Sequence, residues 1–533
     1  MQYGTDENTG QPQMNSAAPL ATANESYASI DARRLSLEAL WHRGCCLATF
    51  LEQQGVKEDS AVAILMRNDL SFLESMIAIS VLGAYAVPLN WHLTGPEIKY
   101  ILEDSGALML MAHADLYCPV AQFVPSKEQC VIARTPEEIS GPYRIHADQC
   151  EVPEGVVNLD DAINVSQPQL DRSRVGSRNS ILYTSGTTGR PKGVRKLPLP
   201  AVEARKYAQL SQLWFDLKPD VRTVMAGPMY HSAPNTYTRQ VLNSGGSITL
   251  MARFDAEELL AVIERDRITH LHLVPIMMVR LLRLSEEVKK RHNLSSLQFV
   301  IHGAAPISVE TKRAFIEWWG PVIYEYYGST EAGMISRSST EEWLERPGTV
   351  GKAWPGREVR IYSDSGEILA PGTVGDVYAG LQGVPNFTYQ NADAQRLEIG
   401  RDGLITNGDV GYLDEDGYLF LVDRKNDIVI SGGVNIYPAE IECALIEHTA
   451  VADCAVIGIP DEEFGEKLLA FVKSTPGETL TQAELTTYLR GKLAGLKVPK
   501  EFVFTDSLPR DDSGKLMKRK LRDPYWAGRS RMI

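Results

Sequence analysis

The loop from Tyr183 to Gly193 has the composition of a polyphosphate-binding site. It reads Tyr-Thr-Ser-Gly-Thr-Thr-Gly-Arg-Pro-Lys-Gly. Glycines let backbone N–H groups approach an anion, hydroxyls donate to phosphate oxygens, and a lysine neutralises charge. The loop is not a Walker A motif, because Lys192 is followed by glycine rather than by serine or threonine. A magnesium ion that accompanies ATP must therefore be held elsewhere in the chain.

Three other residues are of types that nucleotide chemistry could use. Glu331 ends a Tyr-Gly-Ser-Thr-Glu run, and its carboxylate oxygens suit Mg²⁺. Asp409 could accept hydrogen bonds from two hydroxyl groups. Lys515 is a cation that follows Gly514, with further basic residues after it. Taken alone, each has a structural alternative: a solvated glutamate, a turn residue, and one more cation in a basic tail.

These residues belong to five segments that together resemble the signature motifs of the acyl-adenylate-forming superfamily, in the family's order. That superfamily contains acyl-CoA synthetases, amino-acid-adenylating domains and luciferases. The resemblance covers roughly residues 30 to 525 and is closest to the AMP-forming acyl-CoA synthetases. The five segments are Tyr183–Gly193, Tyr327–Glu331, Thr406–Tyr412, Asp423–Ile441 and Leu508–Lys515.

The resemblance implies an enzyme that uses ATP, Mg²⁺ and CoA. Such an enzyme converts a small carboxylic acid and ATP into acyl-AMP and pyrophosphate, and then transfers the acyl group to the thiol of CoA. The ATP phosphates would be held by Thr184, Ser185, Thr187, Thr188 and Lys192. The adenine slot would be formed by Gly303, Ala304, Ala305, Pro306, Tyr326, Tyr327 and Gly328.

The same resemblance implies the remaining catalytic contacts. Thr330 would contact the α-phosphate, and Glu331 would bind Mg²⁺. Asp409 and Arg424 would hold the ribose, and Lys515 would be the catalytic lysine of adenylation.

In the family, the C-terminal domain swings about a hinge between an adenylating and a thiolating pose. The hinge residue would be Asn426, where the family usually has Asp or Lys. Ser431, Gly432 and Gly433 would line the pantetheine tunnel. A second departure is His92, because some family members carry an arginine there that meets the CoA nucleotide. Lys497 and Lys500 are weak alternatives for those phosphate contacts.

The acyl pocket is expected around the segment from Pro228 to Tyr237. His231 stands at the gating position, and we interpret it as steric. No charged side chain occurs in 228–237 or in 332–336, which favours an apolar fatty, aryl or steroidal acid without selecting one. The candidate pocket residues are Tyr230, His231, Ser232, Tyr237 and Met334.

Short apolar runs and helical patterns alternate along the chain, which predicts an α/β fold. Strands are expected at 60–66, 84–89, 107–112, 270–274, 297–302 and 452–459, and helices at 70–82, 96–103, 256–265 and 438–447. We expect a mobile tail at 1–28, a large N-terminal domain of mixed sheets and helices at 29–425, and a small mobile α+β domain at 426–533.

Charge and composition exclude several other classes. A net charge of −14 argues against nucleic-acid binding. The apolar run 76–89 is shorter than the roughly 20 residues of a membrane span. The N-terminus lacks a signal-peptide pattern. The seven scattered cysteines predict buried, reduced thiols and a cytoplasmic protein. A homodimer is left open.

Three alternatives to an acyl-CoA synthetase remain at this point. The first is an acyl-AMP ligase that loads a carrier protein. The second is a non-catalytic nucleotide-binding relative, against which Glu331, Asp409 and Lys515 argue. The third is luciferase-like oxygenation of the adenylate.

Overall fold

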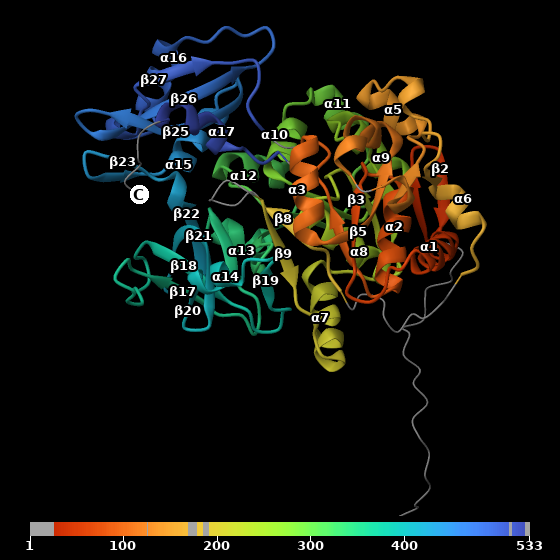
Figure 1. Cartoon of the computed structure of the whole chain (residues 1–533). Coiled ribbons are helices and arrows are strands. Elements are labelled where there is room, and N and C mark those ends of the chain that lie inside the picture. The colour runs from red at the N-terminus through yellow and green to blue at the C-terminus, as the bar shows by residue number, and fades with distance from the viewer. Residues whose placement is uncertain (1–25, 125, 169–177, 185–190, 511–513, 528–533) are drawn as a thin grey trace, which may run out of the picture.

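The computed structural model describes residues 26–124, 126–168, 178–184, 191–510 and 514–527. A large N-terminal α/β domain is followed by a smaller C-terminal domain (Figure 1). The predicted strands and helices are confirmed to within two residues at each end. The prediction that the cysteines are buried is wrong for Cys118, which is exposed where a short 3₁₀ helix (Cys118–Phe123) begins, and Cys443 is only partly buried.

A parallel sheet forms the first part of the large domain. Its strand order is β4-β3-β5-β6-β7, and neighbouring strands run parallel. The helix α2 (Leu70–Val81) is buried almost throughout because it lies between sheets. The strands are β3 (Ala61–Leu65), β4 (Tyr85–Pro88), β5 (Ala107–His113), β6 (Cys130–Ala133) and β7 (Val157–Asn158).

A second sheet of the large domain combines parallel and antiparallel strand pairing. Strands β1, β11, β10, β12, β13 and β14 run parallel to one another in that order. At one end β2 (Arg33–Ser36) pairs antiparallel with β1, and at the other end the strands beyond β14 pair antiparallel. The parallel part comprises β1 (Tyr27–Ile30), β10 (Arg222–Met225), β11 (Ser247–Leu250), β12 (His270–Leu273), β13 (Phe299–His302) and β14 (Ile323–Ser329). The antiparallel part comprises β15 (Gly333–Ser338), β16 (Thr349–Ala353), β17 (Val359–Tyr362), β18 (Gly375–Gly380), β21 (Leu404–Leu413) and β22 (Tyr418–Arg424).

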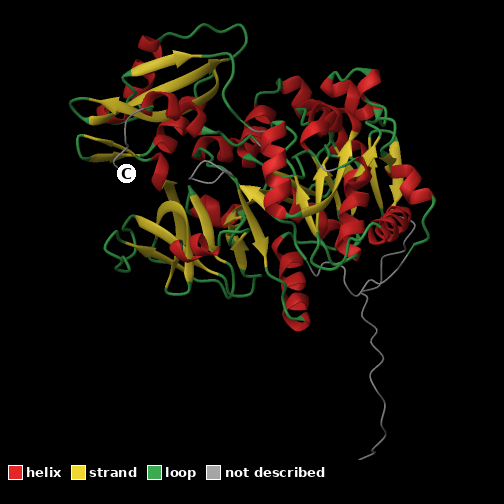
Figure 2. Cartoon of the chain, in the orientation of Figure 1, coloured by secondary structure: helices red, strands yellow, loops and turns green. Residues whose placement is uncertain are grey.

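Helices cover both faces of the parallel part, so helices and strands alternate in layers (Figure 2). One apolar core joins α1 (Leu37–Gln53), α2 and α8 (Ser232–Asn243) to both sheets. A second core packs α9 (Ala256–Arg265), α10 (Pro275–Leu282) and α12 (Val309–Trp319) on the opposite face. This double coverage explains why these strands read as continuous apolar runs.

The C-terminal domain has its own sheet and apolar core. Strands β24-β23-β26-β25 form the sheet, and β27 pairs with β26. The core draws its residues from 429–498. The elements are β23 (Val429–Ser431), β24 (Val434–Ile436), α15 (Pro438–Ile446), β25 (Val451–Asp461), β26 (Gly465–Ser474), α16 (Gln482–Arg490), β27 (Glu501–Phe504) and α17 (Lys518–Trp526).

Candidate active site

The two ends of the predicted phosphate loop form an antiparallel hairpin. Strands β8 (Leu182–Thr184) and β9 (Lys192–Lys196) pair so that Thr184 lies opposite Lys192. The Tyr183 hydroxyl donates to Asp104 Oδ2 at 2.6 Å and fixes one end of the hairpin. The predicted phosphate contacts Ser185, Thr187 and Thr188 lie outside the described residues.

Glu331 lies in the turn between β14 and β15, directly after the last residues of a parallel strand. Its Oε1 accepts a hydrogen bond from the Tyr389 hydroxyl at 3.1 Å. Its backbone carbonyl accepts a hydrogen bond from Lys196 Nζ. Thr330 is half-buried in the same turn. Tyr389 therefore orients the Glu331 carboxylate, while Lys196 anchors the backbone that carries it.

Glu331 fits a magnesium site that is completed by phosphate oxygens. Mg²⁺ is commonly bound by one or two carboxylates together with substrate phosphates. Among the described residues, no group of three or more His, Cys, Asp or Glu side chains could hold a metal alone. One oriented carboxylate beside a polyphosphate loop is consistent with that mode of binding.

The predicted adenine slot lies where β13 ends. A Cβ atom on Gly303 would lie 2.6 Å from the backbone carbonyl oxygen of Tyr326, so only glycine fits this position. Ala304 follows with a positive φ of 69°. Non-glycine residues rarely adopt this backbone conformation, which concentrates at binding sites. Ala305 and Pro306 complete the turn.

The predicted ribose site brings together residues from distant strands. The Tyr327 hydroxyl donates to Asp409 Oδ2 at 2.6 Å, and Arg424 Nε lies 3.4 Å from Oδ1. Asp409 and Arg424 are opposite each other on β21 and β22. Burial, together with the nearby Asp409 charge, raises the pKa of Tyr327 well above its usual value, so the hydroxyl remains a donor. Next to it, Gly328 packs against the Gly333 backbone, where a Cβ atom would lie 2.4 Å from the carbonyl oxygen.

Aromatic side chains dominate the predicted acyl pocket. Tyr237 is fully buried on α8, and its ring packs edge-on against Phe215 with centroids 5.1 Å apart. The rings of Tyr230 and His231 are tilted by 44° to each other, with centroids 4.3 Å apart. Met334 is buried in the same apolar core as Tyr237. His231 is the residue before α8, and Ser232 begins the helix.

His272 links the acyl pocket to the adenine slot, and the sequence had given no reason to single it out. Its Nε2 lies 3.1 Å from the Tyr326 hydroxyl, and its ring centroid lies 5.8 Å from that of Tyr237. Burial lowers the pKa of His272 to about 4, so the imidazole is neutral at pH 7. Alternating side chains on β12 could have suggested an inward-facing histidine, but not its partner.

The sequence also gave no indication of the two side chains that donate hydrogen bonds to Glu331. Tyr389 is 58 residues away from it in the sequence, and Lys196 is 135 residues away. Neither residue belongs to a segment that resembles a family motif. Burial lowers the pKa of Lys196 to about 7. No local pattern could have indicated either contact.

The loop that carries Lys515 is docked against the large domain. Gly514 has a φ of 81°, and a Cβ atom on it would lie 2.2 Å from Cγ2 of Ile276 in the first turn of α10. Ile276 follows β12, while Gly303 follows β13 and Glu331 follows β14. Since these strands are neighbours and run parallel, their carboxyl ends share one edge of the sheet. The lysine loop thus docks at the edge that carries Gly303 and Glu331, two of the predicted nucleotide-site residues.

The predicted hinge and tunnel lie apart from this edge. Asn426 is in a 3₁₀ turn (Lys425–Asp427) between β22 and β23. Lys425 pairs with Asp376 at 2.8 Å in the large domain, and the Asn426 carbonyl accepts from Arg522 at 2.8 Å in the C-terminal domain. The hairpin β23–β24, with Ser431, Gly432 and Gly433, is on the side of the C-terminal domain away from α10 and α12 (Figure 1).

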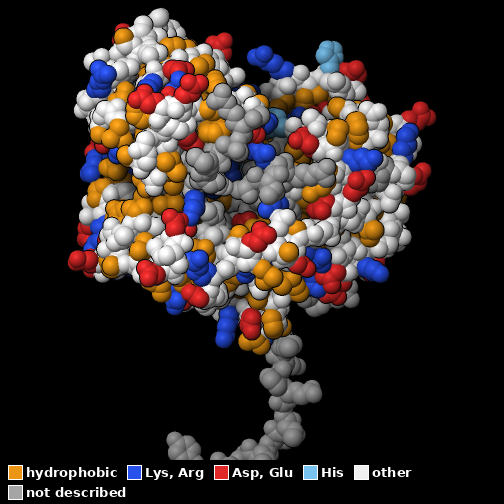
Figure 3. Space-filling view, turned by 60° about the vertical axis from the view of Figure 1, so that its left-hand side comes forward, with side chains coloured by type: hydrophobic (Ala, Val, Ile, Leu, Met, Phe, Trp, Pro, Cys, Tyr) orange, Lys and Arg blue, Asp and Glu red, His pale blue; other side chains and the backbone are white. Residues whose placement is uncertain are grey.

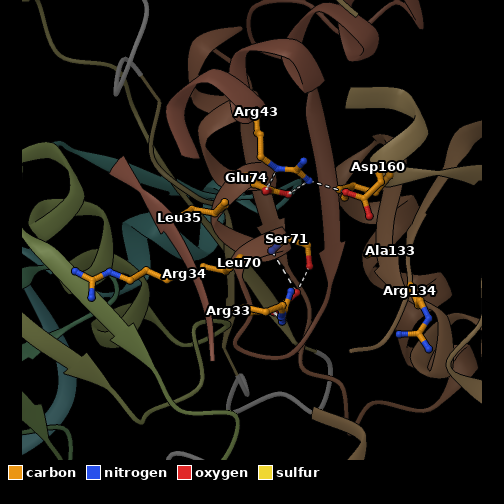
Figure 4. A pocket seen from close by; sticks show the side chains of 12 residues that line it. Arg33, Arg34, Leu35, Arg43, Leu70, Ser71, Glu74, Ala133, Arg134 and Asp160 are labelled. Atoms are coloured by element: carbon orange, nitrogen blue, oxygen red, sulfur yellow. Dashed lines mark hydrogen bonds and ion pairs between the residues drawn. The ribbon is translucent and has the colours of Figure 1, made fainter. Parts of the chain in front are cut away.

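A separate pocket of about 330 Å³ lies at the opposite end of the large domain, among β2 (Arg33–Ser36), α1 and α2 (Figure 4). Five of its charged side chains are engaged with one another. Arg43 bonds Glu74 at 2.5 Å and Asp160 at 2.6 Å, and Arg33 pairs with Asp69. These ion pairs satisfy those five charges without a ligand.

Basic side chains lie along the hollow between the two domains (Figure 3). A local basic group attracts an anionic substrate even though the net charge of the whole chain is −14. Within the described part of the chain, no helix has both the length and the hydropathy of a membrane span.

Comparison with known proteins agrees with this site. Residues 16–385 match the model of the AMP-binding enzyme family, and residues 440–515 match the AMP-binding enzyme C-terminal domain. A feruloyl-CoA synthase from an Amycolatopsis species is 33% identical over 92% of this chain and 93% of its own length. The fatty acid–[acyl-carrier-protein] ligase ScoC of Streptomyces coeruleorubidus is 30% identical over 94% of both chains.

A solved structure provides a further comparison. The o-succinylbenzoate coenzyme A synthetase of Bacillus subtilis, in complex with ATP and magnesium ion, superposes with a TM-score of 0.78 at 26% identity. The match covers 94% of this chain and 97% of the other.

Proposed function

Because this chain belongs to the family of AMP-binding enzymes, we propose that it is an AMP-forming acyl-CoA synthetase. It is an ATP-dependent acid–thiol ligase. The observation that carries the proposal is the docking of the Gly514 backbone against Ile276, at the sheet edge where Glu331 and the adenine turn lie.

In the first half-reaction, a substrate carboxylate oxygen attacks the α-phosphorus of ATP, and the bond from that phosphorus to the pyrophosphate oxygen breaks. Thr184, Lys192 and the Ser185, Thr187 and Thr188 hydroxyls hold the phosphates, with Thr330 at the α-phosphate. Asp409 and Arg424 orient the ribose. Magnesium, held by Glu331, would neutralise charge on the leaving pyrophosphate. Lys515 offsets the negative charge at the α-phosphate where the two anions meet.

In the second half-reaction, the CoA sulfur attacks the acyl carbonyl, the bond to AMP breaks, and the thiol proton is released. We propose that the C-terminal domain first turns about Asn426, so that residues 29–425 and 426–533 act as two units. Ser431, Gly432 and Gly433 would then line the pantetheine path. Lys425 and Arg522 support this pivot, because they tie the two sides of Asn426 to different domains.

We propose an apolar acid as the acyl substrate. Tyr230, Tyr237 and Met334 are buried apolar or aromatic side chains, and the neutral His272 adds no charge beside them. His231 and Ser232 would stand at the pocket entrance. Free CoA is the proposed acceptor. A carrier protein is the second candidate, because a relative of similar identity is named as an acyl-carrier-protein ligase.

The function is tested by incubating the protein with ATP, Mg²⁺ and a panel of fatty, aryl and steroidal acids, with and without CoA. We expect acid-dependent pyrophosphate exchange without CoA, and AMP and thioester with CoA. Exchange without any thioester on CoA would favour a carrier protein as acceptor. Absence of exchange with every acid would refute the adenylation chemistry.

Lys515→Ala is the sharpest single variant. We expect pyrophosphate exchange to fall by about 10² or more, because a preorganised charge in the transition state contributes several kcal/mol. Thioester formation from supplied acyl-adenylate should stay within about twofold of the wild-type rate. An equal loss of both half-reactions would contradict the two-pose mechanism.

We further propose a cytoplasmic enzyme, on the basis of seven cysteines that are free thiols in the structure. A homodimer is tested by light scattering at assay concentration.

A further inference from the structure

Helix α10 ends at the junction between the two domains (Figure 1). The next residue is Arg283, whose side chain crosses that junction. Arg283, in the large domain, donates from Nη1 to the backbone carbonyl of Ala452 at 2.8 Å. Its Nη2 donates to the carbonyls of Val451 and Ile446, the latter at 3.4 Å. All three acceptors belong to the C-terminal domain.

The acceptors suit a guanidinium for a physical reason. Ile446 is the last residue of α15, where helix carbonyls lack intrahelical partners and the helix dipole is negative. Val451 and Ala452 begin β25. An arginine presents several donors in a rigid fork, so one side chain can satisfy carbonyls from two elements at once.

A continuous set of contacts runs from these carbonyls to the lysine loop. Asp453 follows Ala452 and accepts two hydrogen bonds from Arg510, each 2.7 Å long. Arg510 Nη1 then donates to the Gly514 carbonyl at 2.6 Å. Arg510 also bridges Leu516 across the loop. Lys515 therefore lies between two residues whose backbone is fixed through Arg510.

We propose that Arg283 is a positioning residue that holds the C-terminal domain in the adenylating pose and so keeps Lys515 at the site. The inference rests on the proposed function. A turn of the C-terminal domain about Asn426 separates Arg283 from all three acceptors, because none of them is in the large domain. Arg283 thus stabilises one pose and not the other, so its loss lowers adenylation without lowering thioester formation.

The test compares Arg283→Met and Arg283→Lys with Arg291→Met. Arg291 is the control because it lies on the nearby α11 (Glu286–Arg291), is about half exposed, and pairs with Glu257 within the large domain. Pyrophosphate exchange and thioester formation from supplied acyl-adenylate are measured separately. Hydrogen–deuterium exchange of peptides that contain Ile276 reports whether the C-terminal domain is docked.

Arg283→Met should lower the maximal rate of pyrophosphate exchange about tenfold, the size of effect expected from losing charge-assisted hydrogen bonds. The KM values for ATP and acid and the thioester step should change by less than about twofold, and amide exchange near Ile276 should rise. Arg283→Lys should recover part of the rate, and Arg291→Met should match the wild type.

Equal rates of Arg283→Met and Arg291→Met in both half-reactions would overturn the inference while leaving the proposed function intact. A proportional loss of both half-reactions would also overturn it, as would unchanged amide exchange. If the wild type itself gave no pyrophosphate exchange, the proposed function would fail and this inference would fail with it.

Discussion

At the scale of single residues, each of the two carboxylates of the site accepts a hydrogen bond from a tyrosine hydroxyl. Tyr389 donates to Glu331 at 3.1 Å, and Tyr327 donates to Asp409 at 2.6 Å. Each tyrosine occupies one acceptor position and leaves others for a ligand, because an ionised carboxylate has about four such positions. The tyrosines therefore orient the carboxylates before any ligand binds.

Lys196 gives a pH prediction at this scale. Burial lowers its pKa from 10.5 to about 7, so between these values the unfolded chain binds a proton that the folded protein does not. Stability should therefore rise with pH from about 7 to about 10.5, by at most about 1.4 kcal/mol per pH unit from this group. Lys196→Met lacks this contribution.

The measurement is the free energy of unfolding by urea at pH 7, 8 and 9 for both proteins. The difference between wild type and Lys196→Met should grow in favour of the wild type as pH rises. Parallel curves would show that Lys196 keeps its ordinary pKa in the folded protein.

At the scale of elements, the carboxyl ends of β12, β13 and β14 place three chemical functions at one edge. They carry the docking position of the lysine loop, the predicted adenine turn and the turn with the proposed magnesium ligand Glu331. In open parallel sheets, ligands bind at this edge because the loops that follow neighbouring strands converge there. The apolar strands therefore decide where the polar motifs meet.

The adenine turn gives a prediction for this scale. In Gly303→Ala the new Cβ atom would lie 2.6 Å from both the Tyr326 carbonyl oxygen and its ring, so the backbone must move. We expect a loss of about 1 to 3 kcal/mol in stability and a KM for ATP that rises more than the KM for the acid. Thermal unfolding and steady-state kinetics measure the two effects.

Gly495→Ala is the matched control, because a Cβ atom there meets nothing within 4 Å and the backbone is not left-handed. It should leave both KM values unchanged. An ATP affinity in Gly303→Ala equal to that of this control would remove Gly303 from the nucleotide site.

At the scale of the whole molecule, the structure represents one of the two proposed poses. The lysine loop contacts the large domain, whereas the Gly432–Gly433 turn is exposed on the other side of the C-terminal domain. Both half-reactions would share one acyl site, so the lysine loop and the Gly432–Gly433 turn must occupy it at different times. This arrangement makes substitutions at the exposed turn silent in adenylation.

Gly433→Leu tests this arrangement. We expect thioester formation from acyl-adenylate to fall at least about tenfold, because the side chain would obstruct the pantetheine path, while pyrophosphate exchange is kept. Gly477→Leu is the control: both glycines are exposed with open space around them and have similar φ values, 81° and 86°. Each substitution should destabilise the fold by about 1 to 2 kcal/mol. An equal loss of thioester formation in both variants would place Gly433 outside the path.

The sequence by itself determined the family and the α/β class and predicted the site residues, because each motif is a contiguous run whose chemistry is carried by the residues it contains. It also predicted the principal strands and helices to within two residues, since their apolar patterns are local. Tertiary structure alone decided the partners of those residues. Contacts across separations of 54 to 169 residues in the sequence are made by Tyr389, Lys196, His272 and Arg283. A periodic residue pattern reflects only nearby positions, so it cannot indicate such contacts. Packing also selected the pose, because the docking of Gly514 on Ile276 depends on the shapes of two domains rather than on either segment.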